Sequence, residues 1–235
     1  MLKLRQAALI AGLAYLLNPV PYAEFSIMPK LVAMGHPDQT VTNIAAHSGM
    51  FVTAIFCYLI NFVEDILIAW ALYFLLAPVN RAVSALASIF QLVYAAIALG
   101  GWLHLVEAYR ILMNPEYTNA FGPVAVREQV DVLLHSFRYD YSTSILLFAI
   151  HLVLIGALIV RSTYVPKWLG VLLIVDGVAW WVNDLGPYFY TSANLGFLFP
   201  IFFVELIFMV WLLFWGSRLP VTTDDDNQLA WRTKP

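Results

Sequence analysis

The sequence predicts an all-α protein, a polytopic integral membrane bundle of about six transmembrane helices. Hydrophobic residues make up 62% of the 235 residues and charged residues only 11%, whereas soluble domains carry roughly 25% charged residues. The apolar residues gather in six runs, and about 20 residues are enough for a helix to cross the bilayer core. One integral domain over residues 1–218 fits this length, followed by a polar cytoplasmic tail over residues 219–235.

Charge and cysteine content narrow the expected partners. The net charge is −3 and no basic face stands out, which argues against nucleic acid as a partner. The single cysteine, Cys57, excludes an intrachain disulfide. Membrane lipids and a hydrophobic small molecule are the expected partners, no cofactor is required, and the oligomeric state is left open.

The first apolar run covers residues 7–28 and is interrupted by Pro19 and Pro21. Because proline lacks a backbone N–H, we expect this first helix to break there, as membrane proteins allow where the break lines a cavity. Basic residues before an apolar stretch also fit a signal peptide. No small-residue cleavage site follows, so the run is interpreted as a retained first span.

Two longer runs follow, over residues 43–78 and 82–106. Asn80 lies between them and is typical of a residue that caps the N-terminus of the second helix. The pair Gly100 and Gly101 indicates a place where two helix backbones approach closely.

Residues 114–140 form the longest stretch between the expected spans. Within it, apolar side chains recur at helical spacing from Val124 to Phe137. This pattern predicts a short amphipathic helix, either lying on the membrane surface or connecting two spans in solvent.

Three more spans are expected at residues 142–160, 168–185 and 197–215, and the polar tail is expected to be disordered. With the amino terminus inside, eight Lys and Arg residues fall on cytoplasmic segments and four on outer ones. Because positive charge concentrates on the cytoplasmic side, both termini are expected in the cytoplasm of a multi-pass protein of the cell membrane.

Each expected span carries its most polar internal residue near its centre. An ionisable residue at that depth costs at least ~2.5 kcal/mol and marks a functional site by default. These central residues are Asn18, the pair Glu64 and Asp65, Gln91 with Tyr94, His151, Asp176 and Glu205.

Helical spacing predicts that these residues face the interior of the bundle. Cys57, Asn61 and Asp65 recur every four residues on one stripe of their helix. Asp176, Trp180 and Asn183 follow at spacings of four and three residues and share one face of theirs. Because adjacent helical residues point about 100° apart, Asp65 is the preferred inward carboxylate and Glu64 the reserve.

Acids that share a dry pocket cannot all be ionised, and a protonated acid beside a charged one is what general acid–base catalysis needs. The expected proton donors and acceptors are Asp65, Glu64, Asp176 and Glu205, with His151 as a shuttle or orienting group. The residues expected to contact substrate are Asn61, Gln91, Tyr94, Trp180, Asn183 and Glu24. The alternative is that these side chains hydrogen-bond between helices and only hold the bundle together.

A second polar group is expected near the outer face, where His47, His104 and Glu107 are weak candidates for divalent metal ligands. No tight metal-binding signature is present. Surface ion pairs and interfacial histidines are the simpler interpretation, and no metal is favoured.

Four segments resemble an uncharacterised bacterial and archaeal membrane family, domain of unknown function 4386. They are residues 7–15 (AALIAGLAY), 71–81 (ALYFLLAPVNR), 164–173 (YVPKWLGVLL) and 205–216 (ELIFMVWLLFWG). The resemblance implies a compact multi-span protein and places Glu24, Asp65 and Glu205 where the family often has acids. Gln91 stands where such sequences often carry arginine, which weakens an anion-binding role there.

The preferred functional prediction is an intramembrane enzyme that acts by acid–base chemistry on a lipid-soluble, isoprenoid-like substrate in a mid-bilayer pocket. Isomerisation or cyclisation is the sharpest version, with Trp180 and neighbouring aromatic rings stabilising a carbocation. Small membrane terpene cyclases are similar in size and acid usage, by analogy alone. The alternatives are a proton-coupled transporter of a small hydrophobic molecule, a metal-dependent membrane hydrolase that uses the outer histidines, and a structural or regulatory membrane protein.

Overall fold

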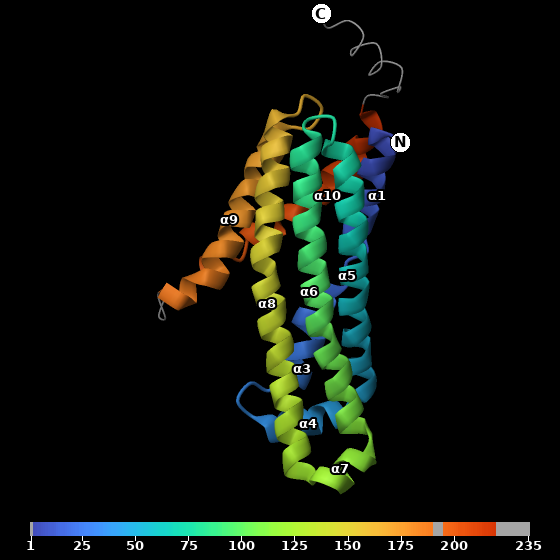
Figure 1. Ribbon diagram of the computed structural model, residues 1–235, viewed down its shortest axis with the longest axis vertical. Helices are drawn as coiled ribbons and strands as arrows, with labels where there is room; N and C mark the ends of the chain where they lie inside the picture. The colour runs from blue at the N-terminus through green and yellow to red at the C-terminus, as the bar shows by residue number, and fades with distance from the viewer. Residues whose placement is uncertain (1, 190–194, 220–235) are drawn as a thin grey trace, which may run out of the picture. The chain divides into compact units, whose positions relative to one another are not determined.

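The computed structural model describes residues 2–189 and 195–219, and these residues are all-helical (Figure 1). The α-helices are α1 (Leu4–Leu16), α2 (Val20–Tyr22), α3 (Met28–Leu31), α4 (Pro37–Ala46), α5 (Ser48–Leu76), α6 (Arg81–Met113), α7 (Pro115–Phe121), α8 (Pro123–Arg161), α9 (Lys167–Phe189) and α10 (Val204–Trp215). A π-helical turn spans Ala23–Ile27, and 3-10 turns span Gly196–Leu198, Ile201–Phe203 and Gly216–Arg218.

Five helical segments in the described part of the chain are long and apolar enough to cross a bilayer. They are Ser48–Leu76, Arg81–Met113, Pro123–Arg161, Lys167–Gly186 and Gly196–Arg218. The chain is thus an all-helical, multi-pass membrane protein.

The expected break in the first apolar run is confirmed, although only one of the two prolines causes it. The helix ends at Leu16 and resumes at Val20, so Pro19 lies in the break. Pro21 lies in the first turn of α2, where its missing N–H would have no helical partner anyway. With 13 residues, α1 alone is about 20 Å long, shorter than the ~30 Å bilayer core.

The separate amphipathic helix expected within residues 114–140 is wrong. Val124 to Phe137 form the first part of α8, which continues unbroken for 39 residues to Arg161. The polar residues 138–142 were interpreted as a boundary, but none of them is glycine or proline, so nothing stops the helix there. The boundary lies earlier, at Gly122, whose φ of 81° ends the short helix α7.

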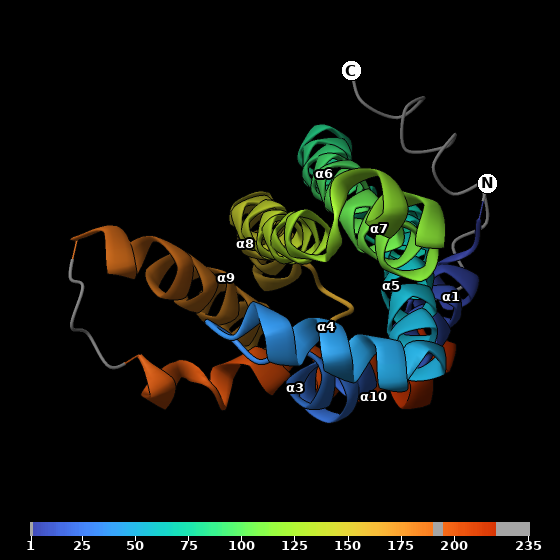
Figure 2. The same ribbon diagram turned by 90° about the horizontal axis from the view of Figure 1, so that it is seen from below.

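The second span also begins later than expected. Residues 37–46 form a helix of their own, α4, and α5 starts at Ser48 rather than near Asn43. In Figure 2, α3 and α4 lie side by side. The Thr40 side chain accepts a hydrogen bond from the Ala33 N–H at 3.0 Å, and the Asn43 side chain donates to the Leu31 carbonyl at 3.5 Å.

The chain divides into two compact units. Unit 1 comprises residues 1–16, 67–91 and the described part of 148–235; unit 2 comprises residues 17–66 and 92–147. The helices α5, α6 and α8 contribute residues to both units. The single domain over residues 1–218 stays a prediction, and nearly all of the expected tail, from residue 220, lies outside the described residues.

In unit 1, α1 packs closely against α10, as Figure 1 shows for the blue and red helices. Gly12 makes this approach possible, because a Cβ there would lie 2.9 Å from the Leu213 side chain. The Tyr15 and Phe208 rings meet edge to face at 6.3 Å. At the end of this pair, the Arg5 Nε donates to the Leu219 carbonyl at 2.7 Å.

Small residues also bring α8 and α9 together in unit 1. A Cβ on Gly156 would lie 2.6 Å from the Gly170 carbonyl oxygen, and a Cβ on Gly177 would lie 2.7 Å from the Ala149 carbonyl oxygen. Such close backbone contact is typical of small residues between membrane helices. The two helices are antiparallel, because contacts later in α9 fall earlier in α8.

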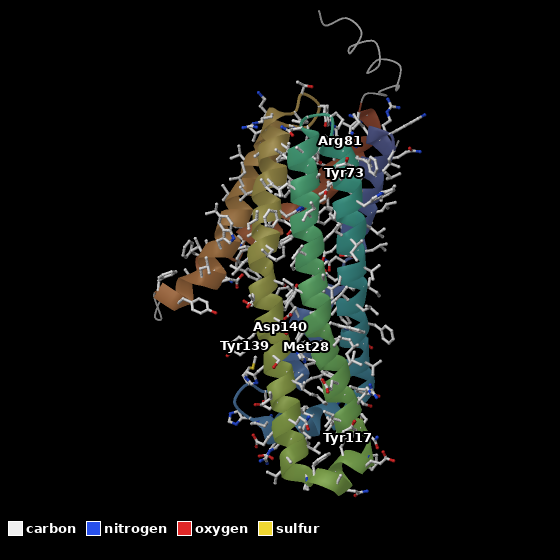
Figure 3. All side chains as sticks on the ribbon, viewed as in Figure 1. Met28, Tyr73, Arg81, Tyr117, Tyr139 and Asp140 are labelled. Atoms are coloured by element: carbon white, nitrogen blue, oxygen red, sulfur yellow. The ribbon has the colours of Figure 1, made fainter. Side chains whose placement is uncertain are left out.

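The turn between α5 and α6 in unit 1 is held by side chains. Asn80 accepts from the Val83 N–H at 3.1 Å, which confirms the expected cap. Arg81 donates to the Tyr73 hydroxyl at 3.2 Å, and both residues are labelled in Figure 3. The Tyr164 hydroxyl donates to the Leu75 carbonyl at 2.6 Å and ties the α8–α9 loop to this turn.

In unit 2, α6 meets α8 at Gly101, as the glycine pair indicated. A Cβ on Gly101 would lie 2.9 Å from the Asp140 Cβ, whereas a Cβ on Gly100 would meet nothing within 4 Å. Next to this contact, the His104 Nε2 lies 3.2 Å from the Asp140 carboxylate.

Candidate functional site

Unit 1 holds three almost fully buried polar side chains inside its apolar helices. Asp176 and His151 are 0% exposed and Gln91 is 1% exposed. They come from α9, α8 and α6 respectively. Their burial agrees with the expectation that the central polar residues face inward, and each of the three comes from a different helix.

Contacts place these three side chains at nearly one level of unit 1. The His151 Nδ1 lies 2.9 Å from the Ala87 carbonyl oxygen, and Gln91 is one helical turn further along α6. Asp176 directly precedes Gly177, which packs against Ala149 and Leu152 on either side of His151. Since one turn rises about 5.4 Å, all three lie within about one turn of each other along the helices.

The hydrogen bonding of this group leaves reactive atoms without partners. Because a carbonyl oxygen can only accept, the His151 Nδ1 must donate its proton to Ala87, which leaves Nε2 as the free ring nitrogen. Neither carboxylate oxygen of Asp176 has a hydrogen-bond partner among the described residues. Buried polar atoms are normally satisfied, so this arrangement indicates a role beyond helix packing.

The remaining sequence-predicted residues of unit 1 are less enclosed. Trp180 is half-buried and stacks on Phe202 with ring centroids 4.0 Å apart. Asn183 is half-buried and donates to the Asp184 carboxylate at 3.4 Å. Glu205 is half-buried in the first turn of α10.

Unit 2 contains the adjacent acids of α5. Asp65 accepts a hydrogen bond from Asn61 at 3.0 Å, as their shared stripe predicts. Glu64 is also buried, at 4% exposed against 8% for Asp65. Neither Glu64 oxygen has a hydrogen-bond partner among the described residues, so the reserve carboxylate is the unsatisfied one. Tyr94 of α6 is buried as well.

A second cluster in unit 2 is built around Glu24. The Tyr58 hydroxyl donates to the Glu24 Oε1 at 2.5 Å, and the Arg138 Nη1 lies 3.5 Å from the Glu24 Oε2. Tyr58 is held in place by Phe137 and Tyr141, whose ring centroids lie 4.8 Å and 6.1 Å from its own. The π-helical turn that contains Glu24 thereby faces α5 and α8.

Arg138 and Tyr58 were missed by sequence reasoning. The fourth span is expected to begin at residue 142, which leaves Arg138 in the polar stretch before it. The signal that would have found it is the absence of a helix breaker between Phe137 and Ser142, which keeps Arg138 on the same helix as the apolar run. Tyr58 carried no signal, since one tyrosine in an apolar helix usually only packs.

A pocket of about 310 Å³ adjoins the Glu24 cluster within unit 2. Its walls come from residues 24–34 and from the first part of α8, and include Met28, which Figure 3 labels. Glu24 is the sequence-predicted substrate residue that lines it.

The weak metal candidates do not gather into a site. Among the described residues, no group of three or more His, Cys, Asp and Glu side chains is placed to hold a metal ion. His104 pairs with Asp140, while His47 and Glu107 are exposed.

Comparison with known proteins identifies the family. The sequence profile of the Domain of unknown function (DUF4386) family matches residues 10–216. The chain belongs to this family. An uncharacterised protein of Archaeoglobus fulgidus is 30% identical to the DUF4386 chain over 157 residues, which cover 66% of this chain and 78% of the relative. No solved structure matches the DUF4386 chain.

Family membership confirms the resemblance seen in the four sequence segments. The matched range contains Glu24, the α5 acids, His151, Asp176 and Glu205. Asp65 and Asp176 belong to different units of the DUF4386 protein, so each acid is considered with the residues of its own unit.

Proposed function

We propose that this DUF4386 protein is an intramembrane enzyme that moves protons on a lipid-soluble, isoprenoid-like substrate. The observation that carries the proposal is Asp176, a fully buried carboxyl group without a hydrogen-bond partner among the described residues, level with the free Nε2 of His151. Apolar surroundings and a proton-bearing group together suit a substrate that enters from the bilayer.

The proposed reaction is isomerisation of a carbon–carbon double bond. Asp176, starting as the neutral acid, gives its proton to one alkene carbon, and the π electrons form the new C–H bond. The neighbouring carbon becomes cationic and then loses a proton from the carbon next to it to a carboxylate. The electrons of that C–H bond form the new double bond, so the substrate gains and loses one proton.

The other predicted residues have distinct roles in this proposal. His151 exchanges protons with Asp176 between turnovers, and the stacked pair Trp180 and Phe202 offers π electrons to the cation. Within unit 1, Glu205 is the proposed proton acceptor. Substrate orientation is assigned to the polar residues of the same unit, Gln91 and Asn183.

The proposal includes six crossings with both termini in the cytoplasm. The Arg5 side chain bonds to the Leu219 carbonyl, so the start of α1 and the end of α10 lie at the same end of unit 1. Termini on one side require an even number of crossings. This favours counting α1 to α3 as a broken first span, in addition to the five long segments, and the excess of Lys and Arg favours the cytoplasmic side.

A proton-coupled transporter is the second candidate, favoured by the discontinuous helices. The chain breaks between Leu16 and Val20, and two 3-10 turns precede α10. Transporters build their binding sites from such broken helices.

Purified protein in detergent separates the two candidates. The enzyme converts a polyene such as squalene to a double-bond isomer without any proton gradient, and Asp176→Asn abolishes the conversion while Asp38→Asn does not. A transporter converts nothing in detergent and moves substrate only in sealed vesicles with a pH gradient. Equal conversion by wild type and Asp176→Asn contradicts the enzyme proposal.

A further inference from the structure

The pocket in unit 2 combines polar and apolar walls. The polar residues Glu24, Asp131, His135 and Arg138 line it together with apolar ones such as Met28 and Leu134. Its volume of about 310 Å³ is roughly ten times the ~30 Å³ that one water molecule occupies in the liquid. A compact polar head and the first carbons of an attached chain fit in that space.

The pocket lies at the membrane interface. The apolar run of α8 begins near Ser142, and Arg138 precedes it by about one helical turn. Asp131 is 11 residues before Ser142, a rise of about 16 Å. Because headgroups occupy only the outermost ~5–7 Å on each side of the hydrocarbon core, the polar wall extends from the headgroup region into water.

The charges of the pocket leave one carboxylate without a fixed cation. Arg138 lies 3.5 Å from the Glu24 carboxylate, so these two charges balance each other. The His135 Nδ1 lies 2.9 Å from the Asp131 carbonyl oxygen and 3.5 Å from the Asp131 carboxylate. The carbonyl takes the shorter contact, and no arginine or lysine among the described residues forms an ion pair with the Asp131 carboxylate.

The apolar wall suits a flexible chain. Met28, Met34 and Leu134 line it, and methionine side chains adapt to irregular apolar surfaces. Met34 is 53% exposed, so this wall opens toward the outside of unit 2.

We propose that this pocket binds an amphiphile with an ammonium head. The ammonium group pairs with Asp131, and the chain runs along Met28 and Leu134 toward the bilayer. This inference rests on unit 2 alone and is independent of the proton chemistry proposed for Asp176.

Isothermal titration calorimetry with the full chain in dodecyl maltoside tests the proposal. The probe is decyltrimethylammonium, and decanesulfonate is the comparator of equal chain length and opposite charge. Titration into empty micelles subtracts partition into detergent. We expect saturable binding of the ammonium probe and none of the sulfonate.

Three variants assign the binding to the pocket. Asp131→Asn removes the charge and should weaken binding of the ammonium probe at least about tenfold, because it removes the Coulomb attraction between the carboxylate and the quaternary ammonium. Leu134→Trp fills the pocket and should abolish binding. Glu128→Gln removes an exposed carboxylate of the same helix that does not line the pocket, and should leave binding within twofold.

Either of two results overturns the proposal: equal binding of the sulfonate, or unchanged binding by Asp131→Asn or Leu134→Trp. Thermal unfolding of each variant identifies any that fail to fold. If Asp131→Asn unfolds, the Leu134→Trp comparison decides alone.

Discussion

The closest backbone contact in unit 1 gives a quantitative prediction for Gly170→Ala. A Cβ on Gly170 would lie 2.5 Å from the Gly156 carbonyl oxygen and 2.9 Å from the Val160 backbone nitrogen. Ordinary contacts of a Cβ begin at 3.4 Å, so α8 and α9 must separate by about 1 Å. Both opposing atoms are backbone and cannot rotate away.

Overpacking of this kind costs about 1–3 kcal/mol, and alanine returns about 0.5–1 kcal/mol of helix propensity. Because neither neighbour can yield, we expect a net loss of about 2 kcal/mol. For a chain of this size, that lowers the melting temperature by roughly 4–8 °C.

Thermal unfolding of the purified protein in detergent measures the effect. Gly100→Ala is the matched control, because its Cβ would meet nothing within 4 Å. The control should melt at or slightly above the wild-type temperature. A wild-type melting temperature for Gly170→Ala, or the same loss of stability in both variants, would contradict this close packing of α8 and α9.

Three further predictions concern single side chains and topology. Tyr164→Phe should cost about 1 kcal/mol of stability through loss of one hydrogen bond. Burial also raises the pKa of Tyr164 to about 12, so the stabilisation by its neutral hydroxyl should be present below pH 10 and fade as the pH rises toward 12. Thermal unfolding across pH should show that fading in wild type and not in the variant. Tyr58→Phe should cost about 1.5–3 kcal/mol, because it removes a hydrogen bond to the Glu24 carboxylate; an unchanged melting temperature would contradict it. Lys3→Cys and Ser217→Cys should react with an impermeant maleimide from the same face of sealed vesicles, and labelling from opposite faces would refute the even number of crossings.

The sequence predicted the membrane architecture well, because composition and long apolar runs report directly on the bilayer. It also predicted most of the buried polar residues: Asp176, His151, Gln91 and the α5 acids are buried. Asn18 was expected to face inward as well but is exposed, and Glu205 is only half-buried. Depth within an apolar run carries that information, since lipid cannot satisfy a polar side chain.

Helix boundaries in polar stretches were harder to predict. The start of α8 was predicted wrongly because the polar residues around Arg138 were read as the end of a helix. A helix can leave the membrane without breaking, and α8 does so. The preference for Asp65 over Glu64 rested on direction alone, and both are buried. The Glu24–Tyr58–Arg138 cluster joins residues far apart in sequence, and no local pattern indicates such a contact.

Solvent deuterium incorporation tests the central claim most directly. Wild-type protein, incubated with squalene in deuterated buffer and detergent, should place deuterium on carbon, because each isomerisation adds one proton from Asp176. Asp176→Asn should fold but place no deuterium on carbon, while Asp38→Asn should retain the incorporation. Equal deuterium incorporation by wild type and Asp176→Asn would contradict the account.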